Sequence, residues 1–381
     1  MKIAWIALAA LSVGTAYAQS EPYKVFDTKP VITEGPFLSA LSDTAVSVVW
    51  MTDAPSHAKV ILRDGDQVRE IEPQVDGLVP VGQRHVVTVT GLTPGRRYSY
   101  ETVSTRVVKL KPYWPDKGLS TSSAAASFTT FNPQQERVSF SVVTDTHEDT
   151  ARIGRLMKMV DWGSTDALLH LGDAFHWLDS EEQLWAKWLR PTVAGMAPGK
   201  PLLFARGNHE LRGAYARQLA GYVPTPEGSY YYARTMGPVH LLVLDTAEDK
   251  PDDTNVYAQL NRTVPYRADE LAWLRAHVGR STHFAMAPFR VVAMHQGDWG
   301  WLPDNGAAWT ALANQAKVDL VIAGHDHEFS YHAPDREHGY HRLILGQDQL
   351  ARVEATQREL TVRVLSDKGV QVHQLRIPAR H

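Results

Sequence analysis

Residues 320–327 read LVIAGHDH, an apolar run of strand length that ends directly in Gly324, His325, Asp326 and His327. Short apolar runs bounded by glycine are typical of buried strands in the parallel sheet of an α/β fold. In such sheets, ligands bind beyond the carboxyl ends of the strands. The stretch therefore predicts a buried strand that delivers two imidazoles to the edge of a sheet where ligands bind.

Four other apolar runs along the chain end in the same way. Polar residues follow each run: Asp145 and His147 after residues 140–143, Asp173 after 168–171, Asn208 and His209 after 202–204, and His295 after 291–294. One histidine after a strand would carry little weight, because single histidines there are commonly hydrogen-bonded surface or core residues. Five loops that follow one rule instead favour a shared site.

The residues that these loops bring together are nitrogen and oxygen donors of the kind that bind metals. They are Asp145, His147, Asp173, Asn208, His295, His325 and His327. One tetrahedral zinc ion takes about four ligands. Seven donors are therefore too many for one ion and suit two ions that share a bridging carboxylate.

The composition agrees with such a site. The chain of 381 residues contains 17 His and no Cys. Without cysteine there are no disulfides, no thiolate or iron–sulfur metal sites and no cysteine nucleophile, so any metal must be bound by nitrogen and oxygen. The formal net charge of −3 shows no basic excess. Nucleic acid is therefore disfavoured as the main partner.

The first residues have the pattern of a secretory leader. Lys2 precedes an apolar run, and the run is followed by small residues that end in Ala16, Tyr17 and Ala18. The apolar run is shorter than the roughly 20 residues of a membrane-spanning helix, and the A-x-A end is typical of a cleavage site. We expect residues 1–18 to be a Sec-type signal peptide and the mature chain to be secreted or periplasmic, with no membrane span.

The hydrophobic periodicity divides the rest of the chain in two. Residues 31–131 alternate with period two, as in 45–51 and 85–90, which predicts an all-β sandwich. Beyond the polar segment 131–136, apolar runs alternate with helical patterns, which predicts an α/β domain. The expected domains are therefore residues 19–132 and residues 133–381.

Five further elements are expected within the second domain. Helices are predicted around residues 153–160 and 271–278, and a third begins at Ser180, where Ser180 and Gln183 fit a capping box. The last strands, 360–364 and 370–377, return to period two and are expected to close the edge of a sheet.

The polar loops contain, in order, the motifs D-x-H, G-D, G-N-H-E, H and G-H-x-H. In the type and order of these motifs, the chain resembles the calcineurin-type metallophosphoesterases. Residues 91–100, GLTPGRRYSY, resemble the fibronectin type III pattern, in which a tyrosine hydroxyl caps a corner, here that of Tyr98, and Trp50 suits the buried core tryptophan. With this β domain in front, the chain is most similar to the purple acid phosphatase branch.

The resemblance implies a four-layer αββα catalytic domain and a ligand set. It places Asp145, His147 and His327 on one metal and Asn208, His295 and His325 on the other, with Asp173 bridging. It also makes His209, which is not an expected ligand, the candidate for stabilising the transition state and protonating the leaving group.

The chain departs from purple acid phosphatases at two motif positions. Those enzymes read D-x-G and G-D-x-x-Y, with the tyrosine as an iron ligand and the source of colour, whereas this chain has His147 and His176 there. Without a tyrosinate to favour trivalent iron, we expect two divalent ions, drawn from Fe, Mn and Zn, and a protein that is not purple. We expect His176 to orient a ligand through a hydrogen bond or, less favoured, to contact substrate.

The expected activity is hydrolysis of a phosphate monoester by a hydroxide that bridges the two ions. A small phosphorylated molecule is the expected substrate; Glu210 and Asp326 are expected to support neighbouring histidines. Trp299 and Trp301 either line a substrate cleft or pack against the domain. Two alternatives stay open: a phosphodiesterase or a nucleotide or phospholipid hydrolase with the same site, and a surface binding protein whose α/β domain is catalytically idle.

Overall fold

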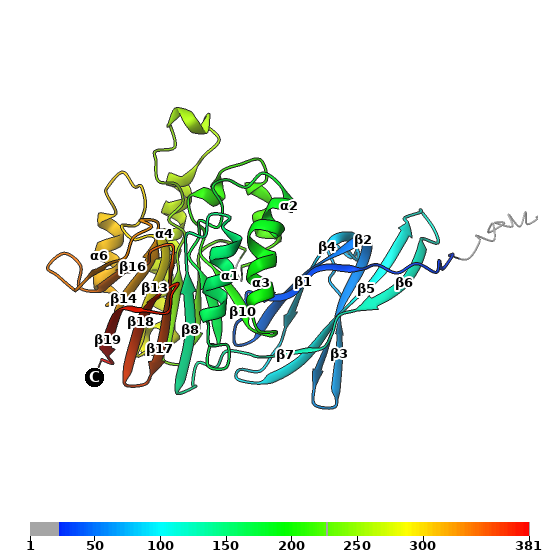
Figure 1. Ribbon diagram of the computed structural model, residues 1–381, viewed down its shortest axis with the longest axis horizontal. Coiled ribbons are helices and arrows are strands. Elements are labelled where there is room, and N and C mark those ends of the chain that lie inside the picture. The colour runs from blue at the N-terminus through cyan, green and yellow to red at the C-terminus, as the bar shows by residue number, and fades with distance from the viewer. Residues whose placement is uncertain (1–22, 226–227, 381) are drawn as a thin grey trace, which may run out of the picture.

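The computed structural model describes residues 23–225 and 228–380, so the leader predicted at 1–18 lies outside the described residues. Two β-sheets pack face to face, and helices cover the outer face of each (Figure 1). Apolar side chains of both sheets, such as Phe140 and Leu169 from one and Leu241 and Val291 from the other, form the core between them. The expected four-layer αββα arrangement is confirmed.

The first catalytic sheet has the order β19-β18-β17-β8-β9-β10. Its strands β8, β9 and β10 are parallel, and β17, β18 and β19 continue it in antiparallel pairing. The strand bounds are β8 Arg137–Val143, β9 Ala167–His170, β10 Pro201–Phe204, β17 Gln349–Thr356, β18 Glu359–Ser366 and β19 Gln371–Pro378. The last two strands close this edge, as predicted.

The second sheet has the order β11-β12-β13-β14-β16-β15. Strands β12, β13, β14 and β16 are parallel, which directs their carboxyl ends to one edge. The strand bounds are β11 Tyr232–Met236, β12 Val239–Val243, β13 Phe289–Gln296, β14 Leu320–Gly324, β15 Ser330–His332 and β16 His341–Ile344.

Helices pack on both outer faces through buried apolar side chains, such as Leu156 on the first sheet and Trp309 on the second. The α-helices are α1 Thr150–Met159, α2 Glu181–Leu184, α3 Arg190–Gly195, α4 Thr263–Arg280, α5 Thr282–Met286 and α6 Ala307–Gln315. A π-helical turn (η1, Trp185–Leu189) and three 3₁₀ turns (η2 His209–Leu211, η3 Ala216–Gly221, η4 Asn255–Tyr257) complete the set. No helix in these described residues is long and apolar enough to cross a membrane.

The predicted helices are present, with one difference at the start of α2. Ser180 Oγ accepts a hydrogen bond from the backbone N–H of Gln183 at 3.1 Å, as a capping box requires. The side chain of Gln183, however, accepts from the backbone N–H of Asp179 at 2.7 Å instead of that of Ser180. The second half of the box is therefore displaced by one residue.

The N-terminal region is all-β, as expected. Its strands are β1 Ile32–Ser39, β2 Ala45–Asp64, β3 Gln67–Ile71, β4 Gly82–Thr90, β5 Arg97–Lys109, β6 Asp116–Ser122 and β7 Ala126–Thr129. The first half of the long strand β2 pairs mainly with β1 and β4 and the second half with β3 and β5, so β2 contributes to two groups of strands. Trp50 is fully buried, and its Nε1 donates to Ser104 Oγ at 2.8 Å.

Tyr98 makes the corner contact that the sequence pattern implied: its hydroxyl oxygen accepts from the backbone N–H of Thr93 at 2.9 Å. The closer likeness to a fibronectin type III domain stays a prediction. One pairing was not expected, since β1 lies parallel to β10, with Leu38 opposite Pro201 and Ser39 opposite Leu202. The N-terminal strands thus extend the same hydrogen-bonded sheet that carries site loops of the catalytic domain.

Candidate metal centre

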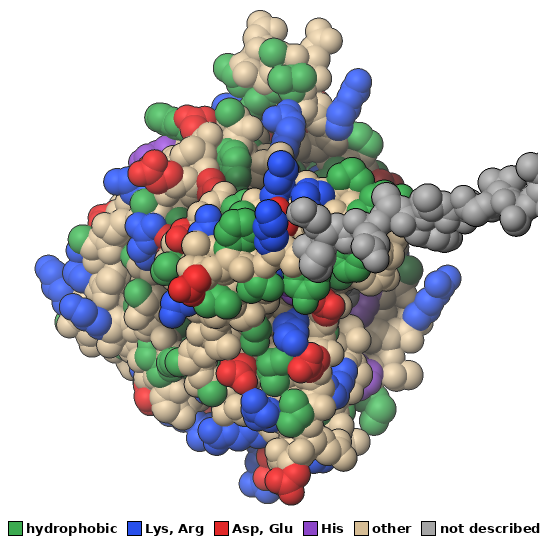
Figure 2. Space-filling model, turned by 90° about the vertical axis from the view of Figure 1, so that its right-hand side faces the viewer, with side chains coloured by type: hydrophobic (Ala, Val, Ile, Leu, Met, Phe, Trp, Pro, Cys, Tyr) green, Lys and Arg blue, Asp and Glu red, His purple; other side chains and the backbone are tan. Residues whose placement is uncertain are grey.

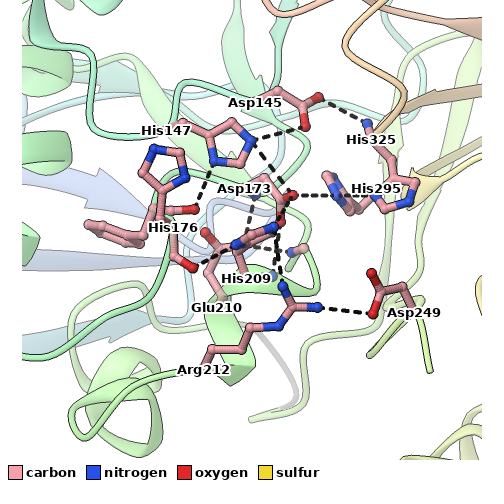
Figure 3. A network of polar contacts seen from close by, with 12 residues as sticks. Asp145, His147, Asp173, His176, His209, Glu210, Arg212, Asp249, His295 and His325 are labelled. Carbon is pink, nitrogen blue, oxygen red and sulfur yellow. Dashed lines mark hydrogen bonds and ion pairs between the residues drawn. The ribbon is translucent and has the colours of Figure 1, made fainter. Parts of the chain in front are cut away.

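The seven expected donors lie at the carboxyl ends of five strands. Six of them form two groups of close ligand atoms, and Figure 3 labels five of these six: Asp145, His147, Asp173, His295 and His325. The seventh, Asn208, directly precedes His209, whose backbone N–H donates to Asp173 Oδ1 at 3.0 Å. Three strands belong to the first sheet and two to the second, so the site lies where the two sheets meet. Loops after β8, β9, β10 and β14 and the end of β13 supply Asp145, His147, Asp173, Asn208, His295, His325 and His327.

Five of these donors have a left-handed backbone. The φ angles are 53° at Asp145, 43° at His147, 53° at Asp173, 76° at His325 and 61° at His327. Such a conformation costs a residue with a side chain about 1–2 kcal/mol. Strain of this kind persists where the surroundings enforce it, and it is concentrated at functional sites.

The first donor group contains Asp145, His147 and His327. His147 Nε2 lies 2.9 Å from His327 Nε2 and 3.8 Å from Asp145 Oδ1, and His327 Nε2 lies 3.4 Å from Asp145 Oδ1. All three ligand atoms lie within 4.8 Å of one another. The spacing allows one cation to contact all three.

The second donor group contains Asp173, His295 and His325. His295 Nε2 lies 3.0 Å from Asp173 Oδ2 and 3.3 Å from His325 Nδ1. Asp173 Oδ2 also lies 3.9 Å from His147 Nε2 in the first group. Asp173 therefore stands between the two groups, where a shared carboxylate would be needed.

Unpaired polar atoms show that the cluster suits a cation. Asp145 Oδ1 and both side-chain amide atoms of Asn208 are buried and have no hydrogen-bond partner within the described part of the chain. Leaving a buried polar atom unpaired costs about 1–3 kcal/mol. A metal ion would satisfy the oxygens, and an all-nitrogen-and-oxygen donor set suits divalent first-row metals.

The pKa values of the donors also show that the site favours a bound cation. Burial lowers the pKa of His147 to about 4, which keeps its imidazole in the neutral form that ligation requires. Burial opposes a charge on His295 as well, but the carboxylate of Asp173 outweighs it and raises the pKa of His295 to about 10. The buried carboxylates thus draw positive charge to this position.

Backbone carbonyls orient the two buried imidazoles. His147 Nδ1 faces the carbonyl oxygen of Phe175 at 3.0 Å, and His295 Nδ1 faces that of Leu171 at 2.7 Å. A carbonyl can only accept, so both rings carry their proton on Nδ1. Each ring therefore turns Nε2 toward the donor groups, the atom that a metal would bind once it carries no proton.

Glu210 holds the loop that carries Asp173. Its Oε2 accepts from the backbone N–H groups of Asp173 and Gly207, both at 2.8 Å, and its Oε1 accepts from that of Ala174 at 2.7 Å. Gly207 is needed here because a Cβ on it would overlap Asp173 Oδ1. Glu210 was expected to support a neighbouring histidine, but these three hydrogen bonds hold the Asp173 loop instead.

His209 and His176 lie beside the first donor group. His209 Nδ1 donates to the backbone carbonyl oxygen of His176 at 2.6 Å, while its Nε2 lies 3.8 Å from Asp173 Oδ2. The ring of His176 is exposed and stacks on that of His147, with centroids 4.8 Å apart. His176 thus contacts its neighbours through a stacked ring and a main-chain carbonyl.

Sequence reasoning missed an ion-pair network next to His209. Arg212 Nη1 lies 3.3 Å from His209 Nε2, and Nη2 binds Glu248 at 2.8 Å and Asp249 at 2.9 Å. Glu248 and Asp249 follow β12 in the same way that the expected donors follow their strands, and that pattern could have revealed them. Trp299 is 3% exposed and stacks on Trp309 at 5.9 Å, so it packs in the core.

Residues 138–329, about half of the chain, match the family model of the calcineurin-like phosphoesterases. The chain belongs to this family of hydrolases, whose members generally use divalent metals.

Two uncharacterized Mycobacterium tuberculosis proteins, MT2654 of strain CDC 1551 / Oshkosh and Rv2577 of strain H37Rv, are each 28% identical to it over 172 residues. The match covers 40% of this chain and 31% of each relative, so the chain spans about a third of the length of these proteins.

Two solved structures share the fold over 92% of the chain. One is the purple acid phosphatase PPD1 from yellow lupin (Lupinus luteus), with a TM-score of 0.65, 13% identity and 74% of its length covered. The other is PhoD, with a TM-score of 0.59, 11% identity and 94% of its length covered. These neighbours confirm the fold.

Proposed function

We propose that this protein is an exported, dinuclear metal-dependent phosphatase that hydrolyses phosphate monoesters. The observation that carries the proposal is the pair of neighbouring donor groups, which Asp173 of the second group links to His147 of the first, together with the unpaired buried atoms of Asp145 and Asn208. Membership of the calcineurin-like phosphoesterases supports the reaction class.

Each ion would take three of the donors in addition to the shared Asp173. Asp145, His147 and His327 would hold one ion, and Asn208, His295 and His325 the other. Two divalent ions bound there would supply an activated water and would neutralise charge on the phosphoryl oxygens. Fe, Mn and Zn all accept this donor set. Because His176 stands at the tyrosine position, we expect a protein that is not purple.

His209 would hold and release the proton that the leaving oxygen needs. The carbonyl of His176 fixes Nδ1, which turns Nε2 toward Asp173 and the donor groups. Arg212 Nη1 lies 3.3 Å from the same Nε2 atom, so a carboxylate and a guanidinium both flank the nitrogen that would carry the proton.

The preference for a monoester rests on charge. Two divalent ions with Asp145, Asp173 and a hydroxide leave a small net positive charge, which a dianionic monoester complements better than a monoanionic diester. The leader pattern supports export to the periplasm or beyond. The proposed substrate is a small phosphorylated molecule.

The test compares p-nitrophenyl phosphate with bis(p-nitrophenyl) phosphate, because both release the same leaving group. The chain beginning at Gln19 is reconstituted in turn with Mn, Fe and Zn, and the metal content of each preparation is measured. The proposal predicts a higher kcat/KM for the monoester. A higher value for the diester would indicate a phosphodiesterase, and metal-loaded protein without turnover on either compound would indicate a binding protein.

A further inference from the structure

The hairpin loop between β5 and β6 presents apolar side chains to solvent at the end of the molecule remote from the metal centre (Figure 1). Residues 109–115 read KLKPYWP. Leu110 is 66% exposed, Tyr113 80% and Trp114 43%. Exposed apolar side chains that gather in one place mark interaction sites, whereas scattered ones do not.

A second segment adds to this surface. Val25 forms a β-bridge with Lys117 at the start of β6, and the backbone N–H of Phe26 donates to the carbonyl oxygen of Lys117 at 2.8 Å. Tyr23, Val25 and Phe26 are 50%, 60% and 40% exposed. We define the hairpin surface by these three side chains with Leu110, Tyr113 and Trp114.

The charges around the hairpin surface are mainly positive. Lys24, Lys109 and Lys117 are exposed, and Asp27 is the exposed acid among them. The nearby Asp116 is buried and is paired with Lys111 at 2.7 Å. Figure 2 looks onto this end of the molecule and shows hydrophobic and basic side chains close together. The basic excess is local, since the whole chain carries a net charge of −3.

We propose that the hairpin surface docks the protein onto an anionic lipid bilayer. Tyrosine and tryptophan rings are favoured at the boundary between lipid and water because one end is apolar and the other polar. Lysines beside them extend their charged groups toward lipid headgroups. Each basic residue near an anionic bilayer strengthens binding about fivefold.

The loop is built to insert with little loss of conformational freedom. Pro112 and Pro115 fix φ on either side of Tyr113 and Trp114, and β5 and β6 pair directly below. A loop that is already ordered pays less entropy on binding. The sheet runs without a break from β6 through β5, β2 and β1 to β10, so docking would hold the metal centre at a set orientation to the bilayer. This proposal does not depend on the substrate of the metal centre.

The test is sedimentation of the chain beginning at Gln19 with vesicles of phosphatidylcholine, with and without phosphatidylglycerol. We expect binding to the anionic vesicles alone, and less binding as salt is raised. The double variants Leu110→Ser/Tyr113→Ser and Lys109→Glu/Lys117→Glu are each expected to weaken binding by at least about tenfold.

Leu78→Ser is the matched control, because Leu78 is 75% exposed in the segment between β3 and β4 and lies outside the hairpin surface. It should bind vesicles like the unaltered chain. Equal melting temperatures and equal phosphatase rates in solution would show that the variants are folded.

Three results would overturn the proposal: no sedimentation with anionic vesicles, equal sedimentation with neutral ones, or full binding by both double variants. Light scattering tests the alternative that a second copy of this chain occupies the hairpin surface. A dimer that Leu110→Ser/Tyr113→Ser converts to a monomer, without vesicle binding by the unaltered chain, would assign the surface to a second copy.

Discussion

Replacing Glu210 with glutamine tests how the chain positions the shared carboxylate. Glu210 is 1% exposed, and its two oxygens accept three backbone N–H groups, those of Asp173, Ala174 and Gly207. A glutamine can keep the oxygen that faces Asp173 and Gly207. Its NH₂ group would then meet the N–H of Ala174, donor against donor, at a site where the two heavy atoms now lie 2.7 Å apart.

The magnitude follows from that one lost contact. A hydrogen bond to a charged group contributes about 1.5–3 kcal/mol, and a buried N–H left unpaired costs about 1–3 kcal/mol. We therefore expect the free energy of unfolding of Glu210→Gln to fall by about 3–5 kcal/mol. Because the Asp173 loop loses its support, metal affinity should fall about 10- to 100-fold.

The assays are thermal unfolding of the metal-free chain and metal titration followed by elemental analysis. Glu248→Gln is the control, because Glu248 is equally buried but binds Arg212 and Tyr257 and no expected metal ligand. It should lose stability and keep metal affinity. If Glu210→Gln bound metal as tightly as the unaltered chain, the positioning role of Glu210 would be refuted.

Three further predictions concern other parts of the chain. His209→Ala should keep both ions and lose about 10²–10⁴-fold in kcat on an alkyl phosphate but less on p-nitrophenyl phosphate, whose leaving group needs no proton; equal losses would contradict the role. Burial lowers the pKa of His85 to about 4 in the folded chain, so the unfolded chain binds its proton first as pH falls below about 6.5. As the pH falls from about 6.5 to about 4, His85 should therefore lower the free energy of unfolding by up to about 3 kcal/mol. Urea unfolding of His85→Gln should show a smaller loss of stability over this pH range; the same dependence of stability on pH as in the unaltered chain would contradict this. Ser104→Ala should lower the free energy of unfolding by about 1–3 kcal/mol, because the buried Nε1–H of Trp50 loses its acceptor; an equal urea midpoint would contradict this.

The site could be predicted from the sequence because its pattern is local. Each apolar run and the polar residues after it are adjacent along the chain, as in residues 320–327, so the strand and its donors are read together. The rule that ligands gather at the carboxyl ends of strands then placed separate loops side by side.

Other features depend on residues far apart in sequence. Ser39 in β1 meets Leu202 in β10 across 163 residues, and nothing in either segment specifies that pairing. Arg212 finds Glu248 36 residues away, and a charge pattern alone does not choose among the many acidic residues. The left-handed backbone at Asp145 and Asp173 is likewise imposed by packing, since neither residue type requires it.

Metal content of Asp173→Asn beside the unaltered chain tests the central claim most directly. Asp173 stands between the two donor groups, at 3.0 Å from His295 Nε2 and 3.9 Å from His147 Nε2. After reconstitution with a divalent metal and removal of the excess, elemental analysis should find about two ions per unaltered chain and at most about one in the variant. Fewer than two ions in the unaltered chain, or two retained by a folded Asp173→Asn variant, would contradict a dinuclear centre with a shared carboxylate.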